Sequence, residues 1–161
     1  MSKTDSVSIG NCGEYFVAAE LERHGFTVAV PMSNTKNFDV LAIDRSNDRQ
    51  IAVQVKTNHT SQRTWTLSRK NETLCGENIY YILVCLNEKG APDYYILPSH
   101  LVAKSVRKSH ADFLSGATTK NGKKGTDTTI RKFSFEIDKY NPYALKADDY
   151  KSNWESLGKR Y

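Results

Sequence analysis

The chain has 161 residues, enough for one domain with its own hydrophobic core. It is 39% hydrophobic and 25% charged, ordinary values for a globular protein, and its formal net charge is +5. The positive charge favours an anionic partner such as nucleic acid, although a solvated basic surface explains it equally well. No apolar run approaches the roughly 20 residues of a membrane span, and the N-terminus lacks an apolar signal-peptide core. We therefore expect a cytoplasmic protein with no membrane contact.

The cysteines give no sign of a metal cluster. Cys12, Cys75 and Cys85 are odd in number, and their spacing matches no zinc-binding pattern. Cys85 lies inside an apolar run, which is typical of a small core residue. We expect three reduced thiols.

The N-terminal part predicts an amphipathic helix over residues 10–24, after a frayed segment 1–9. Three apolar side chains at helical spacing share a face with Glu14: Val17, Ala18 and Leu21. A carboxylate on a buried face is unfavourable unless it is paired, hydrogen-bonded or bound to a metal. The alternative is a carboxylate in a frayed first turn, stabilised by the helix dipole.

Three strands are predicted next: Phe26–Val30, Phe38–Ile43 and Gln50–Lys56. The polar turn 44–48 makes the second and third an antiparallel hairpin. Both faces of Phe38–Ile43 are mostly apolar, so we expect this strand to be covered on both sides.

In the middle of the chain, a polar stretch is followed by a strongly apolar one. Residues 57–78 look irregular, and Trp65 among them could stack on a nucleotide, although a structural role is favoured. Ile79–Leu86 is the strongest buried-strand signal, and Asp93–Leu97 should pair back onto it.

The C-terminal third predicts a helix from His100 towards Leu114, with Ser99 as its N-cap. Its inward residues would be Leu101, Val102, Val106 and Phe113. Residues 116–129 resemble a flexible basic loop rather than a nucleotide-binding P-loop, because the glycine and lysine spacing is wrong. A strand over 130–137 and a short helix from Ala147 follow. We expect a single domain over 1–161, with the core at about 10–115, the loop at 116–129 and the C-terminal strand and helix at 130–161.

An acid, an amide and a lysine meet on the predicted hairpin. Asp39 lies on its first strand, and Gln54 and Lys56 share one face of its second. One interpretation is a structural ion pair between Asp39 and Lys56, since these residue types are rarely buried unpaired. The other is a Mg²⁺ site, because Mg²⁺ prefers oxygen ligands and keeps several waters. There the lysine would orient or deprotonate a water, or stabilise the charge of the transition state.

Asp39, then Gln54-Val55-Lys56, with Glu14 on a preceding helix, resembles the PD-(D/E)XK nuclease superfamily in the Q-x-K variant of Mrr-like endonucleases. The resemblance covers about residues 10–60. It implies a restriction-endonuclease-like α/β core, in which a helix, an antiparallel three-strand meander, a further helix and another strand build a mixed β-sheet flanked by helices.

The resemblance also implies an activity, hydrolysis of phosphodiester bonds by a Mg²⁺- or Mn²⁺-dependent endonuclease. Glu14, Asp39, Gln54 and the Val55 carbonyl would hold the metal, and Lys56 would be the catalytic lysine. An amide brings no negative charge, so Gln54 would be a weaker ligand than a carboxylate. Glu14 then matters more as the second acid.

The implied partner is nucleic acid, with DNA favoured, and nucleases of this kind often act as homodimers. Phosphates would be held by six basic residues: Arg63, Arg69, Lys70, Lys120, Lys123 and Lys124. Binding of this kind weakens steeply with salt. The alternatives are a nuclease-like module that binds nucleic acid without cutting, or a protein-interaction module, for example in a defence system.

Overall fold

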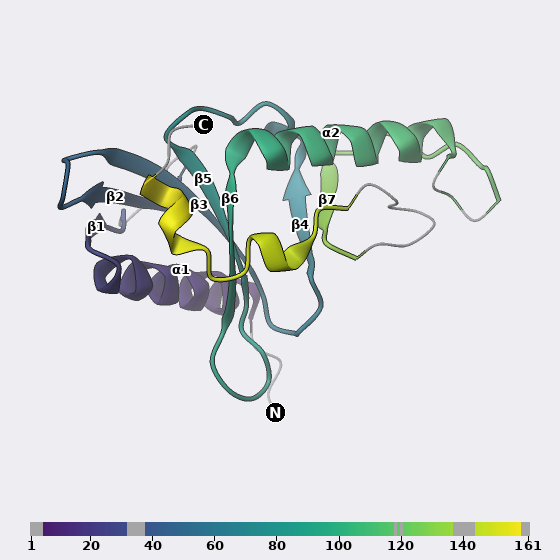
Figure 1. Ribbon diagram of the computed structural model, residues 1–161. Helices are drawn as coiled ribbons and strands as arrows, with labels where there is room; N and C mark the ends of the chain where they lie inside the picture. The colour runs from purple at the N-terminus through teal and green to yellow at the C-terminus, as the bar shows by residue number, and fades with distance from the viewer. Residues whose placement is uncertain (1–4, 32–37, 118, 120, 137–143, 159–161) are drawn as a thin grey trace.

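The computed structural model describes residues 5–31, 38–117, 119, 121–136 and 144–158 (Figure 1). The strands are β1 (Phe26–Ala29), β2 (Val40–Asp44), β3 (Gln50–Asn58), β4 (Thr64–Ser68), β5 (Ile79–Cys85), β6 (Asp93–Pro98) and β7 (Ile130–Ser134). The helices are α1 (Ser6–Arg23) and α2 (Ser99–Ser115), with 3₁₀ turns η1 (Arg69–Glu72), η2 (Ala147–Asp149) and η3 (Trp154–Gly158). In the part of the chain just given, no helix is long and apolar enough to cross a membrane.

A five-stranded mixed sheet in the order β1-β2-β3-β5-β6 forms the centre, and β4 and β7 form a second, two-stranded sheet. Helix α1 lies on one side of the large sheet and α2 runs along its other side (Figure 1). Two hydrophobic clusters result, one beneath α1 and one beneath α2. The predicted α/β class, with a mixed sheet containing an antiparallel meander flanked by helices, is confirmed.

Helix α1 begins four residues earlier than predicted. The Asp5 side chain accepts a hydrogen bond from the Val7 amide at 3.1 Å, and this N-cap allows the helix to start at Ser6. The expectation of a frayed segment 1–9 is therefore wrong for residues 6–9, and residues 1–4 lie outside the described part. Val17 and Leu21 are fully buried against the sheet.

The meander β1-β2-β3 is antiparallel, as predicted, with Val40 opposite Val53 in the hairpin. Strand β2 begins at Val40, later than the predicted Phe38. The expectation that it is covered on both sides is wrong, because its outward side chains, Leu41 and Ile43, are each 39% exposed. The reason is the position of α2, whose main packing partners are β5, β6, β7 and η1.

Strand β3 continues to β5 as a parallel neighbour, and the connection between them is structured. It contains β4 and η1, so the prediction of an irregular stretch over 57–78 is wrong, and no α-helix separates these two strands as the resemblance implied. Trp65 on β4 is 2% exposed and donates its ring N–H to the Val84 carbonyl at 3.0 Å. It packs as a core residue and cannot stack on a nucleotide.

Helix α2 follows β6, and its first turn differs from the prediction. Pro98 takes the cap position, and the Ser99 hydroxyl instead accepts from the Gly76 amide at 3.0 Å and donates to the Gly76 carbonyl at 3.2 Å. Val102 and Val106 are buried as expected. Phe113 is 41% exposed, because it lies beyond the end of the sheet near the segment that follows α2.

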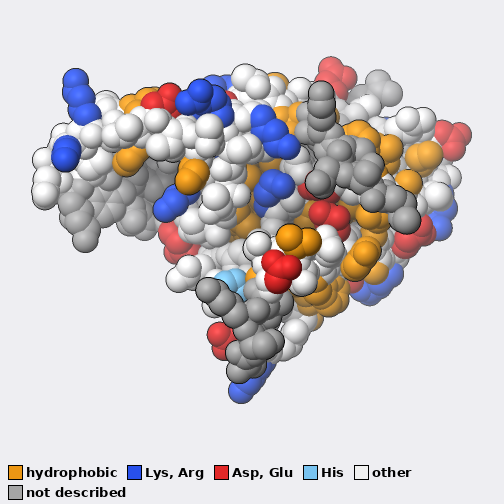
Figure 2. Space-filling view, turned by 180° about the vertical axis from the view of Figure 1, so that it is seen from behind, with side chains coloured by type: hydrophobic (Ala, Val, Ile, Leu, Met, Phe, Trp, Pro, Cys, Tyr) orange, Lys and Arg blue, Asp and Glu red, His pale blue; other side chains and the backbone are white. Residues whose placement is uncertain are grey.

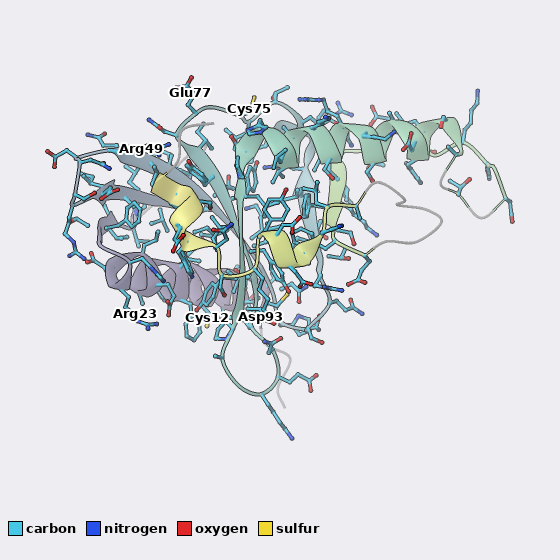
Figure 3. The ribbon with its side chains drawn as sticks, viewed as in Figure 1. Cys12, Arg23, Arg49, Cys75, Glu77 and Asp93 are labelled. Atoms are coloured by element: carbon cyan, nitrogen blue, oxygen red, sulfur yellow. The ribbon has the colours of Figure 1, made fainter. Side chains whose placement is uncertain are left out.

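The C-terminal segment crosses the edge of β6 (Figure 1). The predicted single helix is two 3₁₀ turns, because the chain between them pairs with the strand: Ile96 N–H donates to the Tyr150 carbonyl at 3.0 Å and Ser152 N–H to the Tyr94 carbonyl at 2.8 Å. Arg49 holds the end of the C-terminal segment by donating to the Leu157 carbonyl at 2.9 Å. It also donates to the carbonyl of Glu77, which precedes β5, at 3.2 Å (Figure 3).

The cysteines and the late strand agree with the sequence predictions. All three thiols are free, and Cys85 is buried as expected. The late strand exists as β7, which pairs with β4.

Candidate active site

Asp39 is the central residue of the candidate site. Its own amide donates to the Val53 carbonyl at 2.8 Å, which fixes Asp39 beside β3 directly before β2 begins. Its Oδ2 atom accepts from the Val55 amide at 2.8 Å and from the Gln54 side-chain amide. The Lys56 ammonium lies 3.8 Å from the same oxygen. The side chains that the motif places on neighbouring strands thus meet at one carboxylate.

Lys56 is held in a partly buried position, with 27% of its side chain exposed. Burial lowers its pKa, an effect opposed by Asp39 and reinforced by the positive charge of Lys70. Burial and the repulsion from Lys70 together outweigh the attraction of the carboxylates, so the folded protein favours the neutral amine more than water does. The unprotonated amine is the form that can accept a proton, and a lowered pKa increases its fraction.

Glu14 reaches the same region from α1. Its pKa is raised, first by burial and then by the negative charge of Asp39, while Lys56 acts in the opposite direction. Glu14 therefore interacts electrostatically with Asp39 and Lys56 across the junction of α1 with β3. Two carboxylates that repel each other at a partly buried position are the arrangement that a bound divalent cation relieves.

Gln54 has an unsatisfied atom. The residue is 2% exposed, and its Oε1 atom has no hydrogen-bond partner among the described residues. A buried acceptor left unpaired destabilises a protein by about 1–3 kcal/mol, so such an atom calls for an explanation. Mg²⁺ and Mn²⁺ are bound by oxygen, and this amide oxygen would supply one ligand beside the two acids.

The donor set fits a weakly held, water-rich cation such as Mg²⁺ or Mn²⁺ better than a zinc or copper centre with His or Cys ligands. The described residues contain no group of three or more His, Cys, Asp or Glu side chains able to hold a metal. Two carboxylates, one amide oxygen and a backbone carbonyl remain, which is enough for Mg²⁺ because it retains several waters. For Val55, the structure shows the amide engaged with Asp39, and its carbonyl as a ligand stays a prediction.

Tyr81 and Asn71 support the site from behind, and no sequence pattern indicated this pair. Tyr81 is fully buried on β5 in register with Gln54, and burial raises its pKa to about 12. Its hydroxyl accepts from the Asn71 side chain at 2.7 Å, while the Asn71 oxygen accepts from the Ser68 amide at 2.8 Å. Through this chain of contacts η1 is fixed against β5, next to the catalytic candidates.

The structure describes five of the six predicted phosphate-binding residues, and the two arginines among them are ion-paired. Arg63 is ion-paired with Glu136 at 3.2 Å, and Arg69 with Asp127 at 2.9 Å. Lys70 lies close enough to Lys56 to lower its pKa. Lys123 and Lys124 are exposed in the segment after α2, and Lys120 lies outside the described residues.

The molecular surface seen from behind combines charge with exposed apolar groups. Lys and Arg side chains gather in the upper middle of this view, and carboxylates lie below them (Figure 2). Hydrophobic side chains extend over the side that carries β1 and β2, to which Leu41 and Ile43 contribute. A partner on this surface would meet both cations and apolar side chains.

No protein-family model matches this chain, and no curated protein matches its sequence. Its structure is similar to that of the bacterial homing endonuclease I-Ssp6803I, with a TM-score of 0.55 over 96% of this chain and 92% of that one, at 11% identity. The chain has a nuclease-like fold. Hjc, a Holliday junction resolvase from Archaeoglobus fulgidus, matches with a TM-score of 0.48 at 14% identity over 94% of this chain and 98% of that one, and no argument rests on it.

Proposed function

We propose that the protein is a metal-dependent endonuclease of the Q-x-K type that hydrolyses phosphodiester bonds in DNA. One observation is the main support. A single carboxylate, Asp39, contacts Gln54, Val55 and Lys56, and it interacts electrostatically with Glu14. A nuclease-like fold and a formal net charge of +5 are compatible with a polyanionic substrate.

Glu14, Asp39, the Gln54 amide oxygen and the Val55 carbonyl would hold Mg²⁺ or Mn²⁺. The cation would polarise the phosphate and lower the pKa of a coordinated water. Since Gln54 is neutral, Glu14 supplies the second negative charge, and its raised pKa in the absence of metal predicts that metal binding releases protons at acidic pH.

Lys56 would act on the proton of the attacking water or on the charge that develops on the phosphate. Its ammonium is 3.8 Å from Asp39 Oδ2, so the lysine reaches the region where the ligands meet. Its lowered pKa suits proton acceptance, and in the protonated form the same group stabilises negative charge. Both roles require the amine at this position, and neither is available to an apolar side chain.

The DNA backbone would approach along the surface that carries Lys70 and the segment after α2. The positive charge of Lys70 lowers the pKa of Lys56, so Lys70 lies near the candidate site. Lys123 and Lys124 are exposed. Lys120, Arg69 and Arg63 would add contacts, the two arginines only after exchanging their carboxylate partners for phosphates. We further propose that two copies act together, one on each strand.

The second candidate function is a nuclease-like module that binds nucleic acid without cutting it. One observation favours it: the Gln54 amide donates directly to Asp39, so this carboxylate is satisfied without a cation. In this case the fold would serve recognition, and Lys56 would be only the ion-pair partner of Asp39.

Cleavage and binding assays separate the two candidates. Purified protein is incubated with supercoiled plasmid, single- and double-stranded DNA, branched DNA and RNA, in Mg²⁺, Mn²⁺ or EDTA. The nuclease predicts products only with metal, and their loss in Lys56→Met but not in Lys89→Met, a control at an exposed lysine of the β5–β6 turn. Salt-sensitive binding with no cleavage of any substrate would select the binding module instead.

A further inference from the structure

We infer that Gly13 and Thr57 together set the separation of α1 and β3, and that this contact fixes the distance of Glu14 from Asp39 and Lys56. The two residues directly neighbour the two functional candidates in sequence, one on the helix and one on the strand. The consequence for catalysis rests on the proposed function, whereas the contact itself is a property of the fold.

The contact is closer than any side chain at Gly13 would allow. A Cβ atom built on Gly13 would lie 1.9 Å from Thr57 Oγ1 and 2.9 Å from both Thr57 Cβ and Cγ2. Gly13 is buried within α1. Because a separation of 1.9 Å is far inside van der Waals contact, an alanine there must push the helix away from the strand or reorient Thr57.

The Thr57 side chain is itself unusual. Its hydroxyl oxygen is buried and has no hydrogen-bond partner within the part of the chain that the structure describes. An unsatisfied buried hydroxyl is unfavourable, and glycine is among the poorest residues for a helix interior. A glycine inside a helix and an unsatisfied buried hydroxyl, each locally destabilising, therefore lie at the same contact. This is expected where the position of the helix matters more for function than local stability does.

Helix α1 also offers a matched control. Gly10 is in the same helix one turn earlier, and a Cβ there would meet nothing within 4 Å. Alanine at Gly10 tests the effect of helix propensity alone. Alanine at Gly13 adds the steric overlap with Thr57.

The test compares wild type with four variants: Gly10→Ala, Gly13→Ala, Thr57→Ala and the double variant Gly13→Ala/Thr57→Ala. We expect Gly10→Ala to raise the Tm by about 2–4 °C and to leave cleavage unchanged. Gly13→Ala should lower the Tm despite its better propensity, reduce kcat/KM about 100-fold and weaken Mn²⁺ binding about tenfold. The double variant removes the 1.9 Å overlap with Thr57 Oγ1 and the contact with Cγ2, and keeps the 2.9 Å contact with Thr57 Cβ, which requires a smaller shift. Most of the cleavage and of the Mn²⁺ affinity should then return to the level of Thr57→Ala.

Rescue by the second substitution is the outcome that a merely damaged helix would not give. If Gly13→Ala cleaves and binds Mn²⁺ like wild type, or if the double variant recovers neither, the positioning role is wrong. If wild type does not cleave at all, the proposed function fails while the contact is still tested, by the non-additivity of the Tm values and by the α1–β3 separation in crystal structures of wild type and Gly13→Ala. No increase of that separation would overturn the inference.

Discussion

Replacing Lys56 with methionine distinguishes a catalytic lysine from a structural ion-pair partner. Methionine keeps the length and apolar stem of the side chain and removes the charge. Two unit charges 4 Å apart attract by about 4 kcal/mol at an effective dielectric constant near 20, and the Lys56–Asp39 separation is 3.8 Å. Considered alone, this attraction would make Lys56→Met strongly destabilising.

The direction of the Lys56 pKa shift opposes that conclusion. The pKa is lowered, first by burial of the ammonium, and burial together with the repulsion from Lys70 exceeds the attraction of Asp39 and Glu14. After the substitution, Asp39 still accepts from the Val55 amide at 2.8 Å and from Gln54. We therefore expect the free energy of unfolding to change by less than about 1 kcal/mol, while cleavage falls about 10²- to 10⁴-fold.

The assay is urea denaturation beside initial cleavage rates on one DNA substrate, with Lys89→Met as the control. A loss of about 3–5 kcal/mol, typical of breaking a buried pair, would show that Lys56 is primarily structural. Cleavage within tenfold of wild type would refute its catalytic role.

Three further predictions concern neighbouring carboxylates and the amide. Without metal, Glu14→Gln should raise the Tm by about 2–4 °C. The gain should develop as pH rises from 4.5 through the raised pKa of Glu14, because the ionised form is disfavoured in the folded state; an equal or lower Tm would contradict this. Gln54→Glu should lower the Tm in EDTA and strengthen Mn²⁺ binding about tenfold in calorimetry, and unchanged affinity would exclude this side chain as a ligand. Asp127→Asn removes the carboxylate paired with Arg69, and also with His110 and Arg131, so DNA binding in EDTA should tighten and its log–log salt slope steepen by at least about 0.9 relative to Asp112→Asn, which makes the same charge change.

The local part of the site could be predicted from sequence because its geometry is local. The hairpin register follows from alternation and a short turn, and it places Asp39 beside Gln54 and Lys56. The helical period places Glu14 on the face of Val17 and Leu21. These patterns need no knowledge of distant contacts.

The remainder depended on long-range packing. The position of α2 left Leu41 exposed, although its strand pattern favoured burial, and gave Trp65 a core position that the polar stretch around it did not indicate. The Ser99 hydroxyl bonds to Gly76, which no cap pattern could anticipate. The unsatisfied Gln54 oxygen likewise results from packing across β3 and β5, since nothing in the sequence determines which polar atoms find partners.

The central claim is that Asp39 organises a metal-dependent cleavage site. The most direct test is cleavage of one labelled DNA by wild type and Asp39→Asn, prepared in parallel, in Mg²⁺ and in EDTA. Asparagine matches the carboxylate in shape, so the fold should persist while the negative charge is lost. We predict products only for wild type in Mg²⁺. Cleavage that survives in Asp39→Asn or in EDTA would contradict the account.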